Sequence, residues 1–343
     1  MRRAGLEGDR PHQGPQSRPH AAGDRPRPAI RAHDRGALRA RHGGRPAAAV
    51  TLIVFGSAIA DLVFRVPHLP RPGETVLGEA GAALPGGKGL NQAIAAARDG
   101  GDARFVGCVG RDAHGALLRA AALAAGVDVV GLREVEEGSG FACVCVDAEG
   151  RNQIAVSAGA NRRASAAQVE RIPPEATLLM QMEVPPAANA ALIARGRAAG
   201  ARMLLNLAPA AALAPDALRA LDLLILNESE AAWIGGRLGQ PGDARSLHAA
   251  LGIGVAVTEG ERGVTAVTGE GVLRLPAHRV AVVDTVGAGD AWCGVLAAAL
   301  DRGLPLEAAM RRASAAGSLA CTKPGAAPAM PTAAEIDALL SRS

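Results

Sequence analysis

Aromatic residues are scarce in this chain. Tyrosine is absent, and only four phenylalanines and two tryptophans occur, so the core has to be built from Ala, Val, Leu and Ile. Proteins that bind single-stranded nucleic acid stack the bases on aromatic side chains. The few aromatic residues here are not interleaved with basic clusters. We therefore expect no nucleic-acid partner.

Cysteine is also rare, and its spacing does not suggest a metal site. The five cysteines form no C-x-x-C pair. They are Cys108, Cys143, Cys145, Cys293 and Cys321. This pattern is typical of small buried thiols in a reducing compartment.

Long hydrophobic runs are missing as well. The longest stretch without a charged residue, Pro46–Ala60, has 15 residues, whereas a helix that spans a membrane needs about 20. No apolar segment near Met1 resembles a secretory signal. The prediction is a soluble, cytoplasmic protein with no membrane partner.

The first 48 residues differ in composition from the rest. Residues 1–48 hold 11 arginines, no lysine and 4 acidic residues, a net charge of +7, while the remainder carries −3. They also lack an apolar period, so we expect a disordered N-terminal extension, or a mis-assigned start of translation. A transit peptide is the alternative, but the prolines and acidic residues argue against it. Residues 49–343 are expected to form one folded domain.

Within that domain, short apolar runs alternate with runs rich in Ala and Leu. The predicted strands are Leu52–Phe55, Ala103–Val109, Leu178–Met182, Met203–Leu207, Leu223–Leu226 and Gly254–Thr258. The predicted helices are Asn91–Arg98, Gly115–Ala125, Ala187–Ala199, Glu228–Ile234, Ala288–Leu300 and Leu306–Cys321. Such alternation predicts an α/β fold with a mostly parallel sheet covered by helices on both faces.

Two regions depart from this alternation. About 61–84 and 139–157 look like consecutive short strands joined by turns at Pro72-Gly73 and Glu149-Gly150. We expect them to form a small antiparallel sheet apart from the main one, in the position of a lid over a cleft.

A glycine turn before a helix provides the first candidate site. A β-type run, Arg279–Val283, leads into Gly287, Ala288 and Gly289, and Asp290 follows in the first helical turn. Free N–H groups at a helix start favour anions. Asp290 is therefore either a partner of the helix dipole or a general base.

Two further segments place polar groups at predicted helix starts. Gly86–Gly89 offers glycines and the cation Lys88, and Asn91 that follows is either an N-cap or a ligand. Asn227 and Glu230 lie three residues apart after a strand. They form either a capping box or a pair that organises hydrated Mg²⁺ and phosphate.

Taken together in order, these segments resemble the ribokinase (PfkB-type) family of carbohydrate kinases. The resemblance covers residues from about 52 to 340. The segments that carry it are Arg71–Val76, Gly86–Asn91, Leu179–Glu183, Asn206–Ala210, Asn227–Glu230, Asp284–Asp290 and Lys323–Gly325. It implies a three-layer α/β/α sandwich with a small β-sheet lid.

The resemblance also implies a role for each group of residues. Asp290 aligns with the catalytic base, which also faces the sugar, and Gly287, Ala288 and Gly289 align with the anion hole. The implied sugar-binding positions are Ile59, Asp61, Gly87, Lys88, Gly89, Asn91 and Glu183. The implied ATP-binding positions are Asn227, Glu230, Thr258, Gly260, Arg262, Gly263, Gly289 and Ser314.

Cations and a partner subunit are implied in the same way. A monovalent cation, K⁺, would be held at Asp284, Val286, Ala320, Lys323, Gly325 and Ala329. Mg²⁺ would be bound indirectly through Glu230. The lid would form the contact of a homodimer.

The implied reaction is the ATP-dependent phosphorylation of D-ribose to D-ribose 5-phosphate. Ile59 departs from the family, which usually has Asn there in contact with the sugar. A kinase of the same family that acts on another sugar, a keto-deoxy sugar acid or a nucleoside is therefore an alternative. A sugar-binding regulator without turnover is a second alternative, but Asp290 and its glycine turn are intact. A Rossmann-type dehydrogenase does not fit, because Gly56–Ile59 lacks G-x-G-x-x-G.

Overall fold

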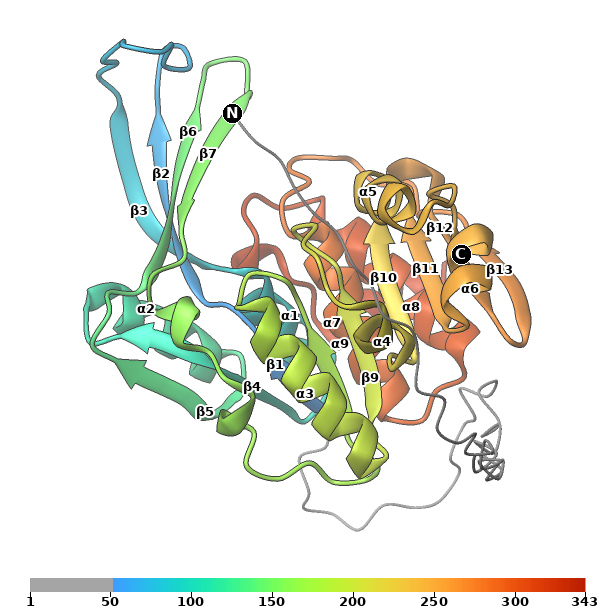
Figure 1. Cartoon of the computed structure of the whole chain (residues 1–343). Coiled ribbons are helices and arrows are strands. Elements are labelled where there is room, and N and C mark those ends of the chain that lie inside the picture. Colours follow the sequence, from blue (N-terminus) through green and yellow to red (C-terminus); the bar gives the residue numbers. More distant parts are fainter. Residues whose placement is uncertain (1–51, 343) are drawn as a thin grey trace, which may run out of the picture. The chain divides into compact units, whose positions relative to one another are not determined.

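A nine-stranded sheet forms the centre of the computed structural model, which describes residues 52–342. Its strand order is β13-β12-β11-β10-β9-β8-β1-β4-β5 (Figure 1). Every neighbouring pair from β5 to β11 is parallel, and β12 and β13 add an antiparallel edge. The strands are β1 (Leu52–Phe55), β4 (Ala103–Gly110), β5 (Asp128–Val135), β8 (Thr177–Met180), β9 (Arg202–Asn206), β10 (Leu223–Asn227), β11 (Gly254–Thr258), β12 (Val264–Thr268) and β13 (Gly271–Leu275). The predicted mostly parallel sheet is confirmed.

The side chains of these strands enter two separate cores. Because successive side chains of a strand point to opposite faces, Leu52 and Val54 join one core, and Ile53 and Phe55 join the other. The first core is covered by α1 (Lys88–Arg98), α2 (Ala113–Ala124), α7 (Ala288–Asp301), α8 (Leu306–Ala320) and α9 (Ala333–Leu340). The second is covered by α3 (Pro186–Ala199), α4 (Pro215–Arg219), α5 (Glu228–Leu238) and α6 (Ala244–Leu251). The predicted three-layer sandwich is confirmed.

Short 3-10 turns complete the connections, at η1 (Gly159–Arg163), η2 (Ala166–Gln168), η3 (Gly260–Arg262) and η4 (Ala327–Ala329). None of the helices in residues 52–342 is both long and apolar enough to cross a membrane. The extension predicted for residues 1–48 lies outside the described residues, as do residues 49–51 and 343.

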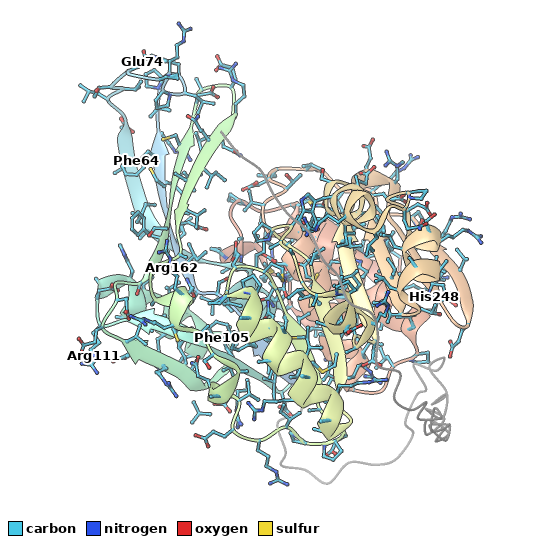
Figure 2. All side chains as sticks on the ribbon, in the orientation of Figure 1. Phe64, Glu74, Phe105, Arg111, Arg162 and His248 are labelled. Atoms are coloured by element: carbon cyan, nitrogen blue, oxygen red, sulfur yellow. The ribbon has the colours of Figure 1, made fainter. Side chains whose placement is uncertain are left out.

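A smaller four-stranded sheet projects from one edge of the main domain (Figure 1). It contains β2 (Ile59–Arg65), β3 (Glu79–Gly86), β6 (Gly140–Val146) and β7 (Asn152–Ser157), in the order β3-β2-β6-β7. Figure 2 labels Glu74 at the tip of this sheet, Phe64 along it and Arg162 at its base. The sheet occupies the two regions predicted to form the lid.

The lid is not wholly antiparallel, as the sequence led us to expect. Its two hairpins are antiparallel, but the central pair, β2 and β6, is parallel. The reason is topological. Strands β1 and β5 run in the same direction in the main sheet, and each continues within a few residues into a lid strand.

The strand predicted at Arg279–Val283 is wrong. These residues lie in the irregular loop between β13 and α7, and Val282 and Val283 are exposed. The N–H of Val283 donates instead to the carbonyl of Cys321 at the end of α8. Without a neighbouring strand, a β-type run has no ladder to join.

The strands β5, β12 and β13 and the helices α4, α6 and α9 lie outside the predicted elements. Strand β5 mixes charged and apolar residues, because it lies at the edge of the sheet. A short segment of this kind carries a weak pattern.

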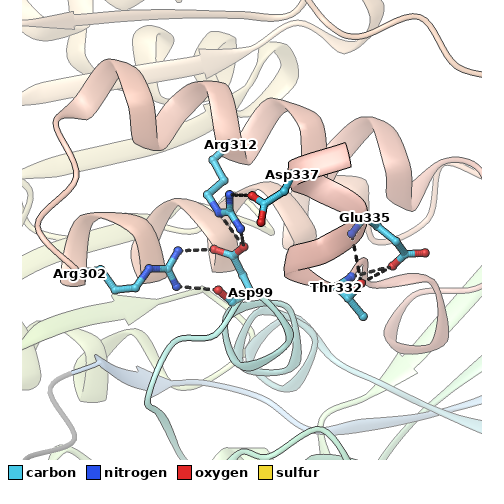
Figure 3. A network of polar contacts seen from close by, with 6 residues as sticks. All are labelled: Asp99, Arg302, Arg312, Thr332, Glu335 and Asp337. Atoms are coloured by element: carbon cyan, nitrogen blue, oxygen red, sulfur yellow. Dashed lines mark hydrogen bonds and ion pairs between the residues drawn. The ribbon is translucent and has the colours of Figure 1, made fainter. Parts of the chain in front are cut away.

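A buried carboxylate at the end of α1 joins this helix to the end of α7, to α8 and, through an arginine of α8, to α9 (Figure 3). Asp99, which caps the C-terminus of α1, has no exposed side-chain surface. Its Oδ2 lies 2.6 Å from Nη2 of Arg302 beyond α7, and its Oδ1 lies 2.6 Å from Nη2 of Arg312 on α8. Arg312 also pairs with Asp337 of α9. The two guanidinium groups offset the cost of burying one carboxylate.

We expect Asp99→Ala to lower the free energy of unfolding by about 3–5 kcal/mol, because two partly buried guanidinium groups lose their partner. Urea denaturation at pH 7 measures this change. Asp216→Ala is the matched control: it removes a carboxylate that is 98% exposed and also paired with an arginine, Arg219. The control should leave the unfolding free energy nearly unchanged. Equal changes in the unfolding free energy of the two variants would show that the ion pairs of Asp99 stabilise the fold no more than an exposed pair does.

Candidate active site

The carboxylate of Asp290 lies at the start of α7, where the main sheet and the lid meet. Gly287 caps this helix with a φ of 80°, in the left-handed region. A Cβ there would lie 2.9 Å from Cα of Ala326, so only glycine fits. Asp290 is the third residue of the helix and is 7% exposed. The predicted position in the first helical turn is confirmed.

The same turn forms the candidate anion hole. The N–H groups of a first helical turn have no acceptor within the helix. That of Ala288 makes a long bond of 3.3 Å to the carbonyl of Thr285. A Cβ built at Gly289 meets no described atom within 4 Å, so this side of the turn is open to a ligand.

Two side-chain amides of α1 hold the Asp290 carboxylate. Nδ2 of Asn91 donates to Oδ2 at 3.0 Å, and Nε2 of Gln92 donates to Oδ1 at 2.9 Å. Helices α1 and α7 approach closely at this point, since a Cβ at Gly294 would lie 2.2 Å from the carbonyl oxygen of Gln92. The carboxylate is thus fixed in orientation by a neighbouring helix.

Asn91 is not an N-cap, which settles the alternative that the sequence left open. The N-cap of α1 is Gly87, with a φ of 87°, and Asn91 lies one turn inside the helix. Its Oδ1 is buried and has no partner among the described residues. That oxygen is available to accept a hydrogen bond from a ligand hydroxyl.

The residues implied to bind the sugar gather beside this carboxylate. Oε2 of Glu183 accepts from Oγ of Ser57 at 2.5 Å and from the N–H of Lys88 at 2.9 Å. The carboxylate of Asp61 packs against Gly86, where a Cβ would lie 2.3 Å from its Oδ2. The first turn of α1 therefore contacts Glu183 through the N–H of Lys88 and Asp290 through the amide of Asn91.

Ile59 is buried at the start of β2 and lines a cavity of about 330 Å³ together with Glu183. Arg162 at the base of the lid lines the same cavity (Figure 2). Ile59 thus borders a cavity that one of the implied sugar contacts, Glu183, also lines.

Several carboxylates lie close together in the site, and the ammonium group of Lys88 offsets part of their negative charge. Burial, with the charges of Glu183 and Asp290, raises the pKa of Asp61 to about 6. Burial also raises the pKa of Glu230. The charge of Asp290, followed by those of Glu183 and Glu230, raises the pKa of Lys88 despite its desolvation. Lys88 therefore stays charged where an anionic group would enter.

The pair Asn227 and Glu230 forms a capping box at the start of α5. The N–H of Asn227 donates to Oε2 of Glu230 at 2.8 Å, and the N–H of Glu230 donates to Oδ1 of Asn227 at 2.8 Å. One oxygen of a buried carboxylate is therefore committed to the helix start.

The segment Thr258–Gly263 turns back sharply after β11. Gly260 and Gly263 have φ values of 57° and 99°, and a Cβ at Gly263 would lie 2.0 Å from the carbonyl oxygen of Leu275. Arg262 in this turn pairs with Glu228 at the start of α5 and lines a cavity of about 730 Å³. Ser314 is buried on α8, and no hydrogen bond among the described residues joins it to this turn.

The loops implied to hold a monovalent cation are joined through Asp284. Its Oδ1 accepts from the N–H of Val286 at 3.0 Å, and its Oδ2 accepts from the N–H of Gly325 at 2.9 Å. Lys323 turns away, because its Nζ lies 2.6 Å from Oε1 of Glu335 on α9. The carbonyl of Ala320 accepts from the N–H of Lys323, and Ala329 lies in η4. The structure therefore gathers Asp284, Val286 and Gly325, but not the Lys323 side chain.

Four polar residues of the site were not assigned a role from the sequence. Besides Ser57 and Gln92 they are Gln181, which follows β8, and Asn206, which ends β9. Each is a buried polar side chain in an apolar run. That is a usable signal, but on its own it does not distinguish a site residue from a hydrogen-bonded core residue.

The sequence profile of the pfkB family carbohydrate kinases matches residues 50–333. A ribokinase of Bacillus subtilis (strain 168) is 35% identical over 294 residues, which cover 84% of this chain and 99% of the relative. A ribokinase of Haemophilus influenzae is 33% identical, with 83% and 96% covered. The solved structure of Arabidopsis thaliana ribokinase complexed with ribose and ATP is similar with a TM-score of 0.77 at 32% identity, covering 86% of this chain and 100% of that one.

We expect the free energy of unfolding to depend on pH through Asp61. Its pKa is 3.8 as an ordinary value and about 6 in the folded chain. Between these pH values the folded state binds more protons than the unfolded state, so the contribution of Asp61 to stability falls as pH rises. Comparing urea denaturation of the wild type and Asp61→Asn across this range measures the effect. As the pH rises through this range, the unfolding free energy of the wild type should fall relative to that of Asp61→Asn. A difference between the two proteins that does not change with pH would contradict the pKa shift.

Proposed function

This chain belongs to the pfkB family of carbohydrate kinases, and we propose that it transfers the γ-phosphoryl group of ATP to the 5-hydroxyl of D-ribose. The observation that carries the proposal is the carboxylate of Asp290, held at an open helix start by Asn91 and Gln92. The similarity to two ribokinases and to a ribokinase solved with ribose and ATP supports D-ribose as the acceptor. The predicted family and the predicted activity as a carbohydrate kinase are confirmed by the family match.

In the proposed reaction the 5-hydroxyl oxygen attacks the γ-phosphorus while its proton passes to Asp290. A bond forms between the sugar oxygen and phosphorus, and the bond from phosphorus to the β–γ bridging oxygen breaks, releasing ADP. Each carboxylate oxygen has room for more than one hydrogen bond. The amides of Asn91 and Gln92 therefore orient Asp290 without preventing it from accepting the proton.

We expect backbone N–H donors and one ammonium group of the site to stabilise the negative charge on the phosphoryl oxygens. The open N–H groups at the Gly287–Gly289 turn and the ammonium of Lys88 face the region beside Asp290. Such preorganised donors stabilise charge that develops in the transition state. We assign the turn at Gly260–Gly263 and Ser314 to nucleotide binding.

Sugar recognition rests on the polar groups on the other side of Asp290. Glu183 and Asp61 offer acceptors for sugar hydroxyls, and the unpaired Oδ1 of Asn91 adds a third. The lid strand β2 carries Asp61, so movement of the lid and binding of the sugar are linked. A lid of this kind excludes water, which would otherwise compete as acceptor.

Mg²⁺ fits the site as an ion bound chiefly by ATP. No group of three or more His, Cys, Asp or Glu side chains within residues 52–342 is placed to hold a metal ion. Mg²⁺ keeps several waters and binds through phosphates and one or two carboxylates. Asn227 and the Glu230 oxygen outside the capping box would hold the hydrated ion, which would supply charge neutralisation.

We further propose a homodimer that forms through the lid. Strand β7 exposes Ile154 and Val156, whose side chains lie on one face of the lid sheet because the two residues are two apart along the strand. An apolar sheet face of this kind is usually covered by a partner. Sedimentation of the wild type as a monomer at micromolar concentration would exclude it.

A coupled assay of ADP release over a panel of acceptors tests the function. We expect D-ribose to give the highest kcat/KM, ahead of another pentose, a keto-deoxy sugar acid and a nucleoside. Asp290→Asn is the control, expected to bind ATP and sugar normally but to lose at least ~10²–10⁴-fold in kcat, because the general base is removed. A preference for another acceptor would overturn ribose as substrate. A variant within about threefold of the wild type would overturn Asp290 as base.

Ile59→Asn is expected to raise kcat/KM for D-ribose by ~10-fold, if about 1.4 kcal/mol of a lost hydrogen bond is recovered. The physical reason is that Ile59 lines the cavity beside Glu183 but offers no hydrogen bond. Ile59→Val, which keeps an apolar side chain, should bring no gain. Unchanged or poorer ribose kinetics in Ile59→Asn would identify Ile59 as a packing residue.

Activation by K⁺ over Na⁺ is our last expectation for this reaction. Asp284 ties the loops at Val286 and Gly325 together, next to the anion hole at Gly287. One carboxylate with backbone carbonyls is a set of hard oxygen donors that suits a weakly charged cation. Steady-state rates in K⁺, Na⁺ and a large organic cation measure the effect, and equal rates in all three would contradict it.

A further inference from the structure

A chain of buried amides runs from the end of β8 to Asp290. Nε2 of Gln181 donates to Oε1 of Gln92 at 2.6 Å, and Nε2 of Gln92 donates to Oδ1 of Asp290 at 2.9 Å. Nε2 of Gln92 also lies 3.2 Å from Oδ1 of Asn206, its second acceptor. Gln92 and Gln181 have no exposed surface.

The direction of this chain is fixed by its acceptors, and Gln181 holds the far end of Gln92. An amide has a donor end and an acceptor end, and Gln92 needs its donor end toward Asp290. A reversed Gln92 would point its oxygen at the carboxylate and at Oδ1 of Asn206, and its NH₂ at the NH₂ of Gln181. Asp290 and Asn206 thus determine which end of Gln92 faces them, and Gln181 supplies the donor that holds its other end.

The position of Gln181 is in turn constrained by the backbone around it. A Cβ at Gly56 would lie 1.8 Å from Oε1 of Gln181, so the amide packs directly on glycine. Nδ2 of Asn189 on α3 donates to the backbone carbonyl of Gln181 at 2.6 Å. The Gln181 side chain is therefore packed against the glycine that follows β1, and its backbone is held by α3. Its Oε1 is buried and has no hydrogen-bond partner among the described residues.

We propose that Gln181 is a positioning residue for the base, acting through Gln92 to hold the Asp290 carboxylate ionised and in one orientation. This assignment rests on the proposed function. Loss of the Gln92 donor would leave Oδ1 of Asp290 without its amide partner, and hydrogen bonds to a carboxylate favour its ionised form. The other titratable groups that act electrostatically on Asp290 or are acted on by it are Asp61, Lys88, Glu230 and Cys293.

Gln181→Met tests the proposal, since it keeps the volume and removes the donor. We expect kcat to fall by ~10-fold, with KM for both substrates nearly unchanged and the acid limb of the pH profile of kcat moved to higher pH. Gln181→Glu should move that limb further, because an ionised Glu would draw the donor end of Gln92 away from Asp290.

Gln168→Met is the matched control. Gln168 is another buried amide, which donates to the carbonyl of Gly107 at 2.8 Å and has no bond to the site residues. Gln168→Met should lower the free energy of unfolding but leave the acid limb of the pH profile of kcat at the same pH. A Gln181→Met profile equal to that of Gln168→Met would overturn the proposal.

A measurement independent of turnover separates this proposal from the proposed function. Carbon-13 NMR of the Asp carboxyls, with Asp290 assigned through Asp290→Asn, gives the pKa of the base directly. The pKa should be higher in Gln181→Met than in wild type, whether or not ribose is the acceptor. An unchanged pKa in Gln181→Met together with normal ribose kinetics would leave the proposed function intact and would refute the positioning role of Gln181.

Discussion

The contact between α1 and α7 is the interaction on which the rest of the site depends. Two adjacent amides of α1, on Asn91 and Gln92, hold the two oxygens of Asp290 at the start of α7. They reach it only because Gly294 lets the helices approach to a distance that no side chain would allow. At the other end of the same helices, Asp99 ties α1 to Arg302 beyond α7. The geometry around the proposed base is therefore a property of a helix pair fixed at both ends.

The parallel sheet explains why groups from distant parts of the chain meet here. Parallel strands end at one edge, and the loops and helix starts that follow them gather there. Glu183 follows β8, Asn227 ends β10, and Asp61 lies in the lid strand that continues from β1. This arrangement is electrostatically unfavourable, because several carboxylates that repel one another share a buried space. Lys88 relieves part of this repulsion, and an incoming phosphoryl group adds charge that the helix start and its N–H groups can accept.

The sequence predicted the layers and the position of Asp290, because a glycine turn before an Ala- and Leu-rich run is a local signal. It did not predict which helix residue faces the base. Asn91 at a helix start looks like a cap, and only the true start at Gly87 places it toward Asp290. Gln92 and Gln181 have ordinary local patterns, and their meaning arises from contacts across the fold. The parallel pair in the lid and the missing strand at Arg279–Val283 likewise depend on neighbours distant in sequence.

In the reaction that we propose, Asp290 is oriented by α1 and receives the proton of the sugar hydroxyl. A crystal structure of the chain with D-ribose and a non-hydrolysable ATP analogue tests it most directly. We expect the 5-hydroxyl oxygen to lie within about 3.2 Å of an Asp290 carboxylate oxygen, and the amides of Asn91 and Gln92 to remain hydrogen-bonded to that carboxylate. A sugar bound with another hydroxyl, or none, beside Asp290, or an Asp290 carboxylate released from both amides in the complex, would contradict it.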